Sequence, residues 1–126
     1  MRRRWERGEG AELAMTATSD DRLLGSLGLL PIDWDRSVVT AGYWVVASER
    51  GRAVATRALR LGTNWALGTL GLAAVELVTM VGSGASERVA QKAGFSVVDE
   101  IPKYEHRSAP GRVYRVKRWQ RRAVGH

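Results

Sequence analysis

Residues 41–56 read AGYWVVASERGRAVAT, a sequence typical of a strand, a tight turn and the start of a helix. The first seven residues are mostly apolar, β-branched or aromatic, as in a buried strand. Residues 54–70 contain no proline and repeat apolar side chains at helical spacing. This order directs several unpaired backbone N–H groups to one place, at the positive end of a helix dipole. We therefore expect an anion site, suited to phosphate, at residues 50–56.

The composition of the turn supports this expectation. Gly51, Ala53 and Ala55 are small, so a ligand can approach the main chain closely, and Arg50 and Arg52 add positive charge. The turn matches neither GxxxxGK[ST] nor GxGxxG, so a P-loop and a dinucleotide fingerprint have no direct support. On its own, the same turn is also compatible with an ordinary connection between a strand and a helix.

Two blocks of sequence resemble the Gcn5-related N-acetyltransferase (GNAT) family, in particular its RimJ/RimL-like branch. In the first block, Gly42-Tyr43-Trp44 precedes RGRAVA at residues 50–55, which is similar to the acetyl-CoA signature Arg/Gln-x-x-Gly-x-Gly/Ala. The second block, ASERVAQKAGF at residues 85–95, is close to the A-S-x-R-V-A-x-K-A-G-F of that branch. The blocks occur in the expected order and separation, and the resemblance covers nearly half of the chain.

The resemblance implies an α+β fold, the GNAT acyl-CoA N-acyltransferase fold, with a mixed, mostly antiparallel sheet flanked by helices. Apolar periodicity and turn signals give the order β-β-β-α-β-α-β-β. The expected strands are residues 12–18, 23–32, 38–47, 73–80, 96–101 and 112–119, and the expected helices are 54–70 and 85–93. We expect one domain over residues 1–126, short at its N-terminal side, because the family normally carries another strand and one or two helices before these elements.

The resemblance also implies acetyl-CoA as cosubstrate and no metal. Its pantetheine arm would enter between the strand ending near residue 47 and the strand 73–80. A backbone N–H of Val45 or Val46 would polarise the thioester carbonyl. Ser83 stands where relatives carry an asparagine that bridges the two strands. The diphosphate would rest on the amides of Arg50, Gly51, Arg52, Ala53, Val54, Ala55 and Thr56.

The catalytic assignments are fewer. Ser86 aligns with a serine of the branch that contacts the cofactor and can protonate the departing thiolate, although a helix N-cap explains it equally well. Ala53 stands where glycine is usual, and Thr40 stands where the branch often has glutamate. The general base is therefore unassigned. Three acidic residues are candidates for the base, without motif support: Asp33, Asp35 and Glu76. Tyr43 and Trp44 would line the acceptor gap or join the core.

The leading function is an N-acetyltransferase that transfers acetyl from acetyl-CoA to a primary amine by direct attack. The acceptor would be a protein N-terminus or a small amine. Ala53, Ser83 and Thr40 also suit an alternative, a catalytically weakened module that binds acyl-CoA or a partner. A small basic RNA-associated protein is a third reading, based on charge alone.

Composition limits these functions further. The chain has 126 residues, a net charge of +7 and no cysteine, so disulfides and thiolate metal sites are excluded. No apolar run approaches the roughly 20 residues of a membrane span, and we expect a cytoplasmic protein. Basic clusters at residues 2–4 and 112–122 lie near the termini, which favours solvation over nucleic-acid binding. His106 and His126 are isolated, without metal-ligand spacing. An exposed sheet edge would favour a homodimer.

Overall fold

The computed structural model describes residues 2–6, 9–51, 53–105 and 109–124, with side chains from residue 9 onward. Over these residues the chain forms strands, two α-helices and a short 3-10 helix at Ala47–Glu49. The helices are α1 (Val54–Gly68) and α2 (Gly84–Lys92). The strands are β1 (Arg2–Glu6), β2 (Gly10–Thr16), β3 (Leu23–Asp33), β4 (Val38–Val45), β5 (Ala74–Met80), β6 (Ser96–Glu105) and β7 (Val113–Arg122).

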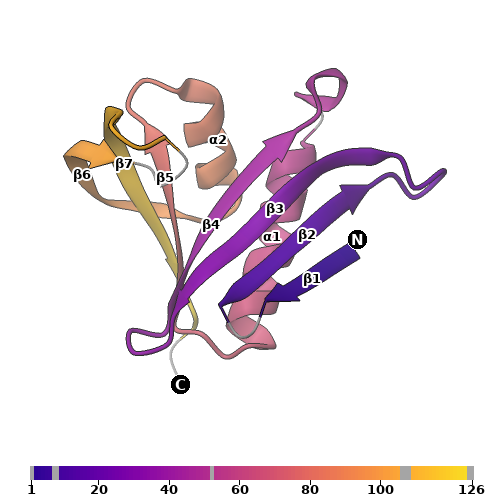
Figure 1. Cartoon of the computed structure of the whole chain (residues 1–126), viewed down its shortest axis with the longest axis horizontal. Helices are drawn as coiled ribbons and strands as arrows, with labels where there is room; N and C mark the ends of the chain where they lie inside the picture. Colours follow the sequence, from indigo (N-terminus) through magenta and orange to yellow (C-terminus); the bar gives the residue numbers. More distant parts are fainter. Residues whose placement is uncertain (1, 7–8, 52, 106–108, 125–126) are drawn as a thin grey trace.

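All of these strands belong to one sheet with the order β1-β2-β3-β4-β5-β7-β6 (Figure 1). Every neighbouring pair is antiparallel except β4 and β5, which are parallel. The predicted α+β class, with a mixed and mostly antiparallel sheet, is therefore confirmed. Neither helix of the described residues is long and apolar enough to cross a membrane.

The predicted order is wrong by one strand. Four strands precede α1, where three were expected, because residues 2–6 form β1 and pair antiparallel with β2 from Arg2↔Ala14 to Glu6↔Gly10. The segment is rich in arginine and has no apolar alternation, so local pattern favoured a tail or a helix end. Backbone pairing with β2 decides its conformation instead, which is common for a strand at a sheet edge.

β4 and β5 form an open V. Their parallel pairing covers only Val38–Thr40 of β4 and Ala74–Glu76 of β5, and the strands then diverge (Figure 1). The last part of β4, residues 41–45, therefore pairs with β3 on one side and faces the gap on the other. α2 follows β5 and lies at the open end of the V.

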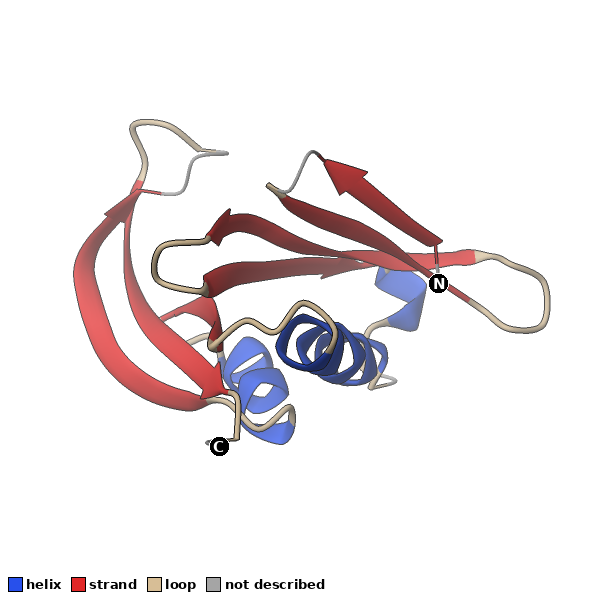
Figure 2. Ribbon diagram, turned by 90° about the horizontal axis from the view of Figure 1, so that it is seen from below, coloured by secondary structure: helices blue, strands red, loops and turns tan. Residues whose placement is uncertain are grey.

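Both α-helices lie on the same face of the sheet (Figure 2). Small residues on α1 face the strands, and an added Cβ at Gly62 would lie 2.3 Å from Leu27 Cδ2. A larger residue at this position would force the buried Leu27 side chain to move, which favours glycine here although glycine lowers helix propensity by about 1 kcal/mol relative to alanine. Leu61 belongs to the apolar repeat of residues 54–70 but is 59% exposed, because α1 turns its small residues toward the sheet. Its buried residues are Val54, Thr56, Ala58, Leu59, Gly62, Thr63 and Ala66.

The opposite face of β2, β3 and β4 has no helix of the described chain over it (Figure 2). Side chains alternate along these strands, so Leu13, Leu27 and Ala41 are buried toward the helices. Their neighbours in sequence point to the other face, where Trp44 is 53% exposed. This outer face forms part of the site described next.

Candidate active site

Two cavities meet at the end of β4. The first, the helix cavity, has a volume of about 560 Å³ and lies at the starts of α1 and α2. The second, the sheet cavity, has a volume of about 920 Å³ and opens on the outer face of the sheet. Both cavities are lined by Tyr43, Trp44 and Ser86, so these three residues form their junction.

The helix cavity contains the predicted anion-binding turn. Gly51, Ala53, Val54, Ala55 and Thr56 line it, and Gly51 and Ala53 are exposed. The first backbone hydrogen bond of α1 is donated by Arg57 N to Ala53 O, at 3.0 Å. No side chain of the described residues caps the start of the helix. Among the described residues, the amides of residues 54–56 have no hydrogen-bond partner, as is usual for the N–H groups at a helix start, and such groups can bind an anion.

The charged residues around the helix cavity are mainly basic. Arg50, Arg88 and Lys92 line it. Glu49 also lines the cavity, but its carboxylate accepts a hydrogen bond from Arg22 Nη2 at 2.9 Å. Arg50 Nε donates to Val45 O at 3.4 Å, which places the Arg50 side chain beside the end of β4. The predicted Arg52 lies outside the described residues.

Ala53 adopts a left-handed backbone conformation, with φ at +61°. The resemblance placed glycine at this position, and the sequence suggested only that a methyl group would crowd the ligand. The structure adds a second reason, because a left-handed conformation costs a residue with a Cβ about 1–2 kcal/mol. Gly51 also has a positive φ, +83°, without this cost.

The two predicted carbonyl-polarising amides differ in direction. Val46 N donates to Leu24 O at 2.8 Å, so this N–H faces β3 and the prediction for Val46 is wrong. In an antiparallel pair the groups of the next residue point the other way. Val45 is the register partner of Gly25, and its N–H is therefore directed toward the gap, where pairing with β5 has ended. Sequence pattern alone does not settle this direction.

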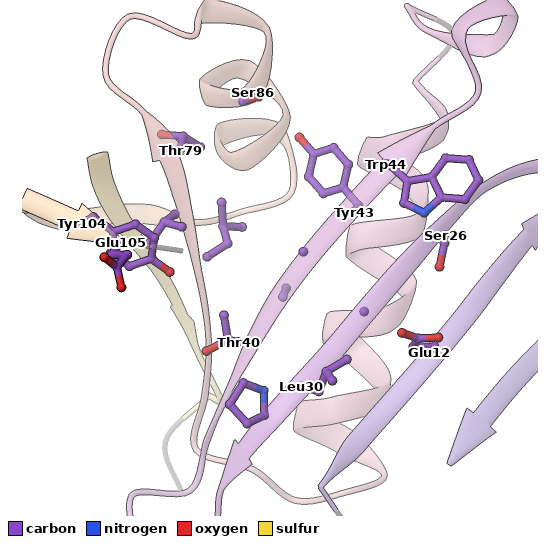
Figure 3. A pocket seen from close by; sticks show the side chains of 16 residues that line it. Glu12, Ser26, Leu30, Thr40, Tyr43, Trp44, Thr79, Ser86, Tyr104 and Glu105 are labelled. Carbon is purple, nitrogen blue, oxygen red and sulfur yellow. The ribbon is translucent and has the colours of Figure 1, made fainter. Parts of the chain in front are cut away.

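Tyr43 and Ser86 form a hydrogen bond between their side chains at the junction. Tyr43 comes from β4 and Ser86 from the first turn of α2, and Figure 3 shows the Tyr43 hydroxyl pointing toward α2. Burial raises the pKa of Tyr43, and the hydrogen bond with Ser86 partly opposes this increase. Tyr43 therefore remains protonated at neutral pH and can donate a proton.

Two glycines form the floor of the sheet cavity. Gly28 and Gly42 are register partners on β3 and β4, and both line the cavity. A Cβ added at Gly42 would have no atom within 4 Å, so internal packing does not require glycine there. The missing side chain instead keeps the cavity deep.

The charged residues that line the sheet cavity in the described chain are both acidic, Glu12 and Glu105. They lie on opposite sides of the cavity (Figure 3). Glu12 is exposed on β2, and Glu105 accepts a hydrogen bond from Gly111 N at 3.1 Å. Sequence reasoning did not select either residue. Alternation along residues 12–18 was the available signal for Glu12, since it places this residue opposite the buried face.

Several predicted residues lie away from the junction. Ser83 lines neither cavity, and its hydroxyl has no hydrogen-bond partner among the described residues. Asp33 and Asp35 also line neither cavity. Thr40 does line the sheet cavity. His106 and His126 lie outside the described residues, and the described chain has no group of three or more metal-binding side chains.

Glu76 is unsuited to act as a free base. It is buried, with an exposed fraction of 7%. Its carboxylate pairs with Arg36 Nη2 at 3.5 Å and with Arg118 Nη1 at 3.0 Å. These two guanidinium groups engage both carboxylate oxygens, so neither oxygen is free to accept a proton from a substrate amine.

Comparison with known proteins assigns the chain to a family. The acetyltransferase (GNAT) domain family matches residues 1–96. The chain belongs to this family. A curated GNAT relative, the probable N-acetyltransferase YjcK of Bacillus subtilis (strain 168), is 34% identical over 94 residues. That match covers 73% of this chain and 51% of the relative, so the chain spans about half the length of that protein.

Solved structures confirm the GNAT fold. A chimera of the spermidine N-acetyltransferase SpeG from Vibrio cholerae and hSSAT superposes with a TM-score of 0.80 at 15% identity, covering 90% of this chain and 67% of that one. A dodecameric structure of spermidine N-acetyltransferase from Vibrio cholerae also has a TM-score of 0.80 at 15% identity, covering 92% and 66%. At this identity the likeness concerns the fold alone.

Proposed function

We propose that this GNAT domain transfers the acetyl group of acetyl-CoA to a primary amine by direct attack. The observation that carries the proposal is the meeting of two cavities of opposite charge at Tyr43, Trp44 and Ser86. Acetyl-CoA is an anion and its thioester must meet an amine, which is a cation in water. A basic cavity and an acidic cavity that share one junction fit this pair of substrates. Family membership and the N-acetyltransferase relatives support the same activity.

The helix cavity fits the phosphate groups of CoA. The diphosphate is assigned to the free amides at residues 54–56 and to the turn at Gly51 and Ala53, with Arg50, Arg88 and Lys92 around it. The edge of β4 at Val45, beyond the end of its pairing with β5, is assigned to the pantetheine arm and to the thioester carbonyl. A backbone N–H donor at that position would stabilise negative charge that develops on the carbonyl oxygen.

The reaction needs one bond to form and one to break. The amine nitrogen bonds to the acyl carbon, the carbon–sulfur bond breaks, and its electron pair leaves with the sulfur. Before it attacks, the substrate ammonium gives one proton to solvent, because only the neutral amine has a free electron pair. After the new bond has formed, the nitrogen loses a second proton to solvent, and the thiolate gains one from a hydroxyl group at the junction. We keep Ser86 as a catalytic and cofactor-contacting residue in this proposal, because it lines both cavities.

The acceptor is proposed to be an amine with additional positive charge. Glu12 and Glu105 are the charged residues that line the sheet cavity in the described part of the chain, although the whole chain carries +7. Trp44 presents an exposed ring beside the same cavity, and aromatic faces attract ammonium groups. Spermidine, named for the two solved relatives, is the first small amine to test. A peptide with a free N-terminus tests the acceptor implied by the RimJ/RimL-like branch, which residues 85–95 still support.

Self-association is also proposed. β6 lies at the edge of the sheet, and Val97 and Val98 on it are 45% and 46% exposed. An unpaired edge with apolar side chains favours pairing with another copy. Light scattering during size-exclusion chromatography tests this, with a monomeric mass as the contrary result.

Two measurements test the proposed activity. Calorimetry with acetyl-CoA should show saturable binding, and a thiol-release assay with spermidine and the peptide should show free thiol in equal amount to N-acetylated product. Saturable binding without transfer to any amine would support the binding module instead. Absence of binding would contradict both functions.

A further inference from the structure

Two hydroxyl groups, those of Tyr43 and Ser86, are hydrogen-bonded to each other where the two cavities meet (Figure 3). The proposed function brings the departing sulfur and the incoming amine together at this junction, which both residues line. From sequence, Tyr43 was expected only to line a gap or to join the core. Its position raises the question of which hydroxyl group gives its proton to the sulfur.

Acidity favours the phenol. An ordinary tyrosine hydroxyl has a pKa of about 10 and a thiol a pKa of about 8.5, so their acidities are similar. Burial raises the pKa of Tyr43 and so makes the transfer less favourable, but the phenol is still much more acidic than an aliphatic hydroxyl. The aliphatic hydroxyl of serine is a far weaker acid than either group. A direct transfer from Ser86 would therefore be much more costly than one from Tyr43.

The surroundings of Tyr43 suit a proton donor. The ring is half-buried, and this burial keeps the phenol protonated. The hydrogen bond with Ser86 lowers the pKa of Tyr43, which means that it stabilises the phenolate more than the phenol. Ser86 is thus placed to stabilise the anion that remains after Tyr43 has given up its proton.

Building on the proposed function, we propose that Tyr43 is the catalytic residue that protonates the departing thiolate, and that Ser86 orients it and stabilises its phenolate. As the carbon–nitrogen bond forms and the carbon–sulfur bond breaks, the electron pair of the latter passes to sulfur, which takes the phenolic proton. The proton released by the amine returns to the phenolate through solvent. The products are CoA thiol and the N-acetylated amine, and the enzyme is unchanged.

Single-turnover rates of acetyl transfer test this assignment. Tyr43→Phe keeps the ring and removes the proton, so the rate should fall about 100-fold or more. The Kd for acetyl-CoA should stay within about twofold, which also shows that the variant is folded. Tyr114→Phe is the matched control, because Tyr114 lies on β7 and lines neither cavity, and its rate should equal that of the wild type.

The pH profile separates a proton donor from a structural hydroxyl. The rate should fall at alkaline pH as Tyr43 loses its proton. Ser86→Ala removes the hydrogen bond that lowers the pKa of Tyr43, so this alkaline limb should move to higher pH, with a smaller loss of rate than in Tyr43→Phe. Site-specific replacement of Tyr43 by 3-fluorotyrosine, a stronger acid, should move the limb to lower pH.

Two results would overturn the assignment: a Tyr43→Phe rate within about threefold of the wild type, or an alkaline limb that does not move with 3-fluorotyrosine. If Ser86→Ala lost as much rate as Tyr43→Phe and its alkaline limb stayed at the wild-type pH, Ser86 would be the proton donor. Failure of the proposed function looks different, since the wild-type protein would then release no thiol with any amine.

Discussion

The two cavities contrast in charge although they share the same strand end. The helix cavity is lined by Arg50, Arg88 and Lys92 and by free helix amides, whereas the sheet cavity is lined by Glu12 and Glu105. Side chains of a strand alternate between its faces, so one strand end can border two cavities. The charge of each cavity is therefore set by the neighbouring elements, while β4 separates the two cavities and brings them together at its end.

The largest expected effect comes from filling one cavity alone. In Gly42→Leu the new side chain would occupy the floor of the sheet cavity, where a Cβ meets no other atom. We expect kcat/KM for the amine to fall about 100-fold, because misplacement of a reactant by about 1 Å has effects of this size. The Kd for acetyl-CoA, measured by calorimetry, should change less than twofold. Gly68→Leu is the control, since Gly68 is exposed at the end of α1 and lines neither cavity.

If kcat/KM for the amine were unchanged or higher in Gly42→Leu than in the wild type, the acceptor would not use the sheet cavity. An equal weakening of acetyl-CoA binding would show that the two cavities are one continuous site.

Charge reversal in the helix cavity is expected to have the next largest effect. Arg50→Glu places a negative charge beside the proposed diphosphate site, so the Kd for acetyl-CoA should rise at least tenfold, or about 1.4 kcal/mol. Arg57→Glu makes the same change of net charge on the exposed side of α1, outside both cavities. Its Kd for acetyl-CoA should stay within about threefold of the wild-type value. Equal effects in the two variants would mean that only the overall charge matters.

A smaller effect is expected from neutralising an exposed carboxylate of the sheet cavity. Glu12→Gln should raise KM for spermidine about threefold at low salt, because an exposed ion pair contributes about 0.2–1 kcal/mol. The difference should disappear at high salt and should be absent for a monoamine. Glu100→Gln, on β6 and outside both cavities, is the control. A salt-independent effect would indicate a steric role for Glu12.

The smallest effect concerns the turn itself. Ala53→Gly removes the cost of a left-handed alanine but gives the unfolded chain more freedom, so the free energy of unfolding should rise by about 0.5 kcal/mol. Ala55→Gly, one position into the regular helix, should lower it by up to about 1 kcal/mol. Denaturant titration of both variants measures this difference. Destabilisation by Ala53→Gly would contradict the strain assigned to the turn.

Local signals were sufficient to predict most elements. The start of α1 follows from the small residues of the turn, and the helix expected over residues 54–70 ends two residues earlier, at Gly68. The strand from residue 23 and the strand from residue 38 begin where they were predicted. These features depend on residues close in sequence, for which propensity and turn chemistry are informative.

What the sequence could not predict depends on contacts between distant segments. β1 has no apolar alternation and exists through its pairing with β2. The direction of the Val46 N–H follows from the register between β3 and β4. Glu12 and Glu105 come from opposite ends of the chain, and only the sheet order brings them to one cavity. The hydrogen bond between Tyr43 and Ser86 likewise needs the V between β4 and β5.

Glu76 carries a consequence for how that V is maintained. It is the register partner of Thr40, at the last paired position before the strands separate, and its arginine partners come from the loop before β4 and from β7. Three segments are thus fastened together at the vertex. A change in the angle between β4 and β5 would have to alter these ion pairs, so the cluster links the vertex to the distance between the Tyr43 phenol and the Ser86 hydroxyl at the open end.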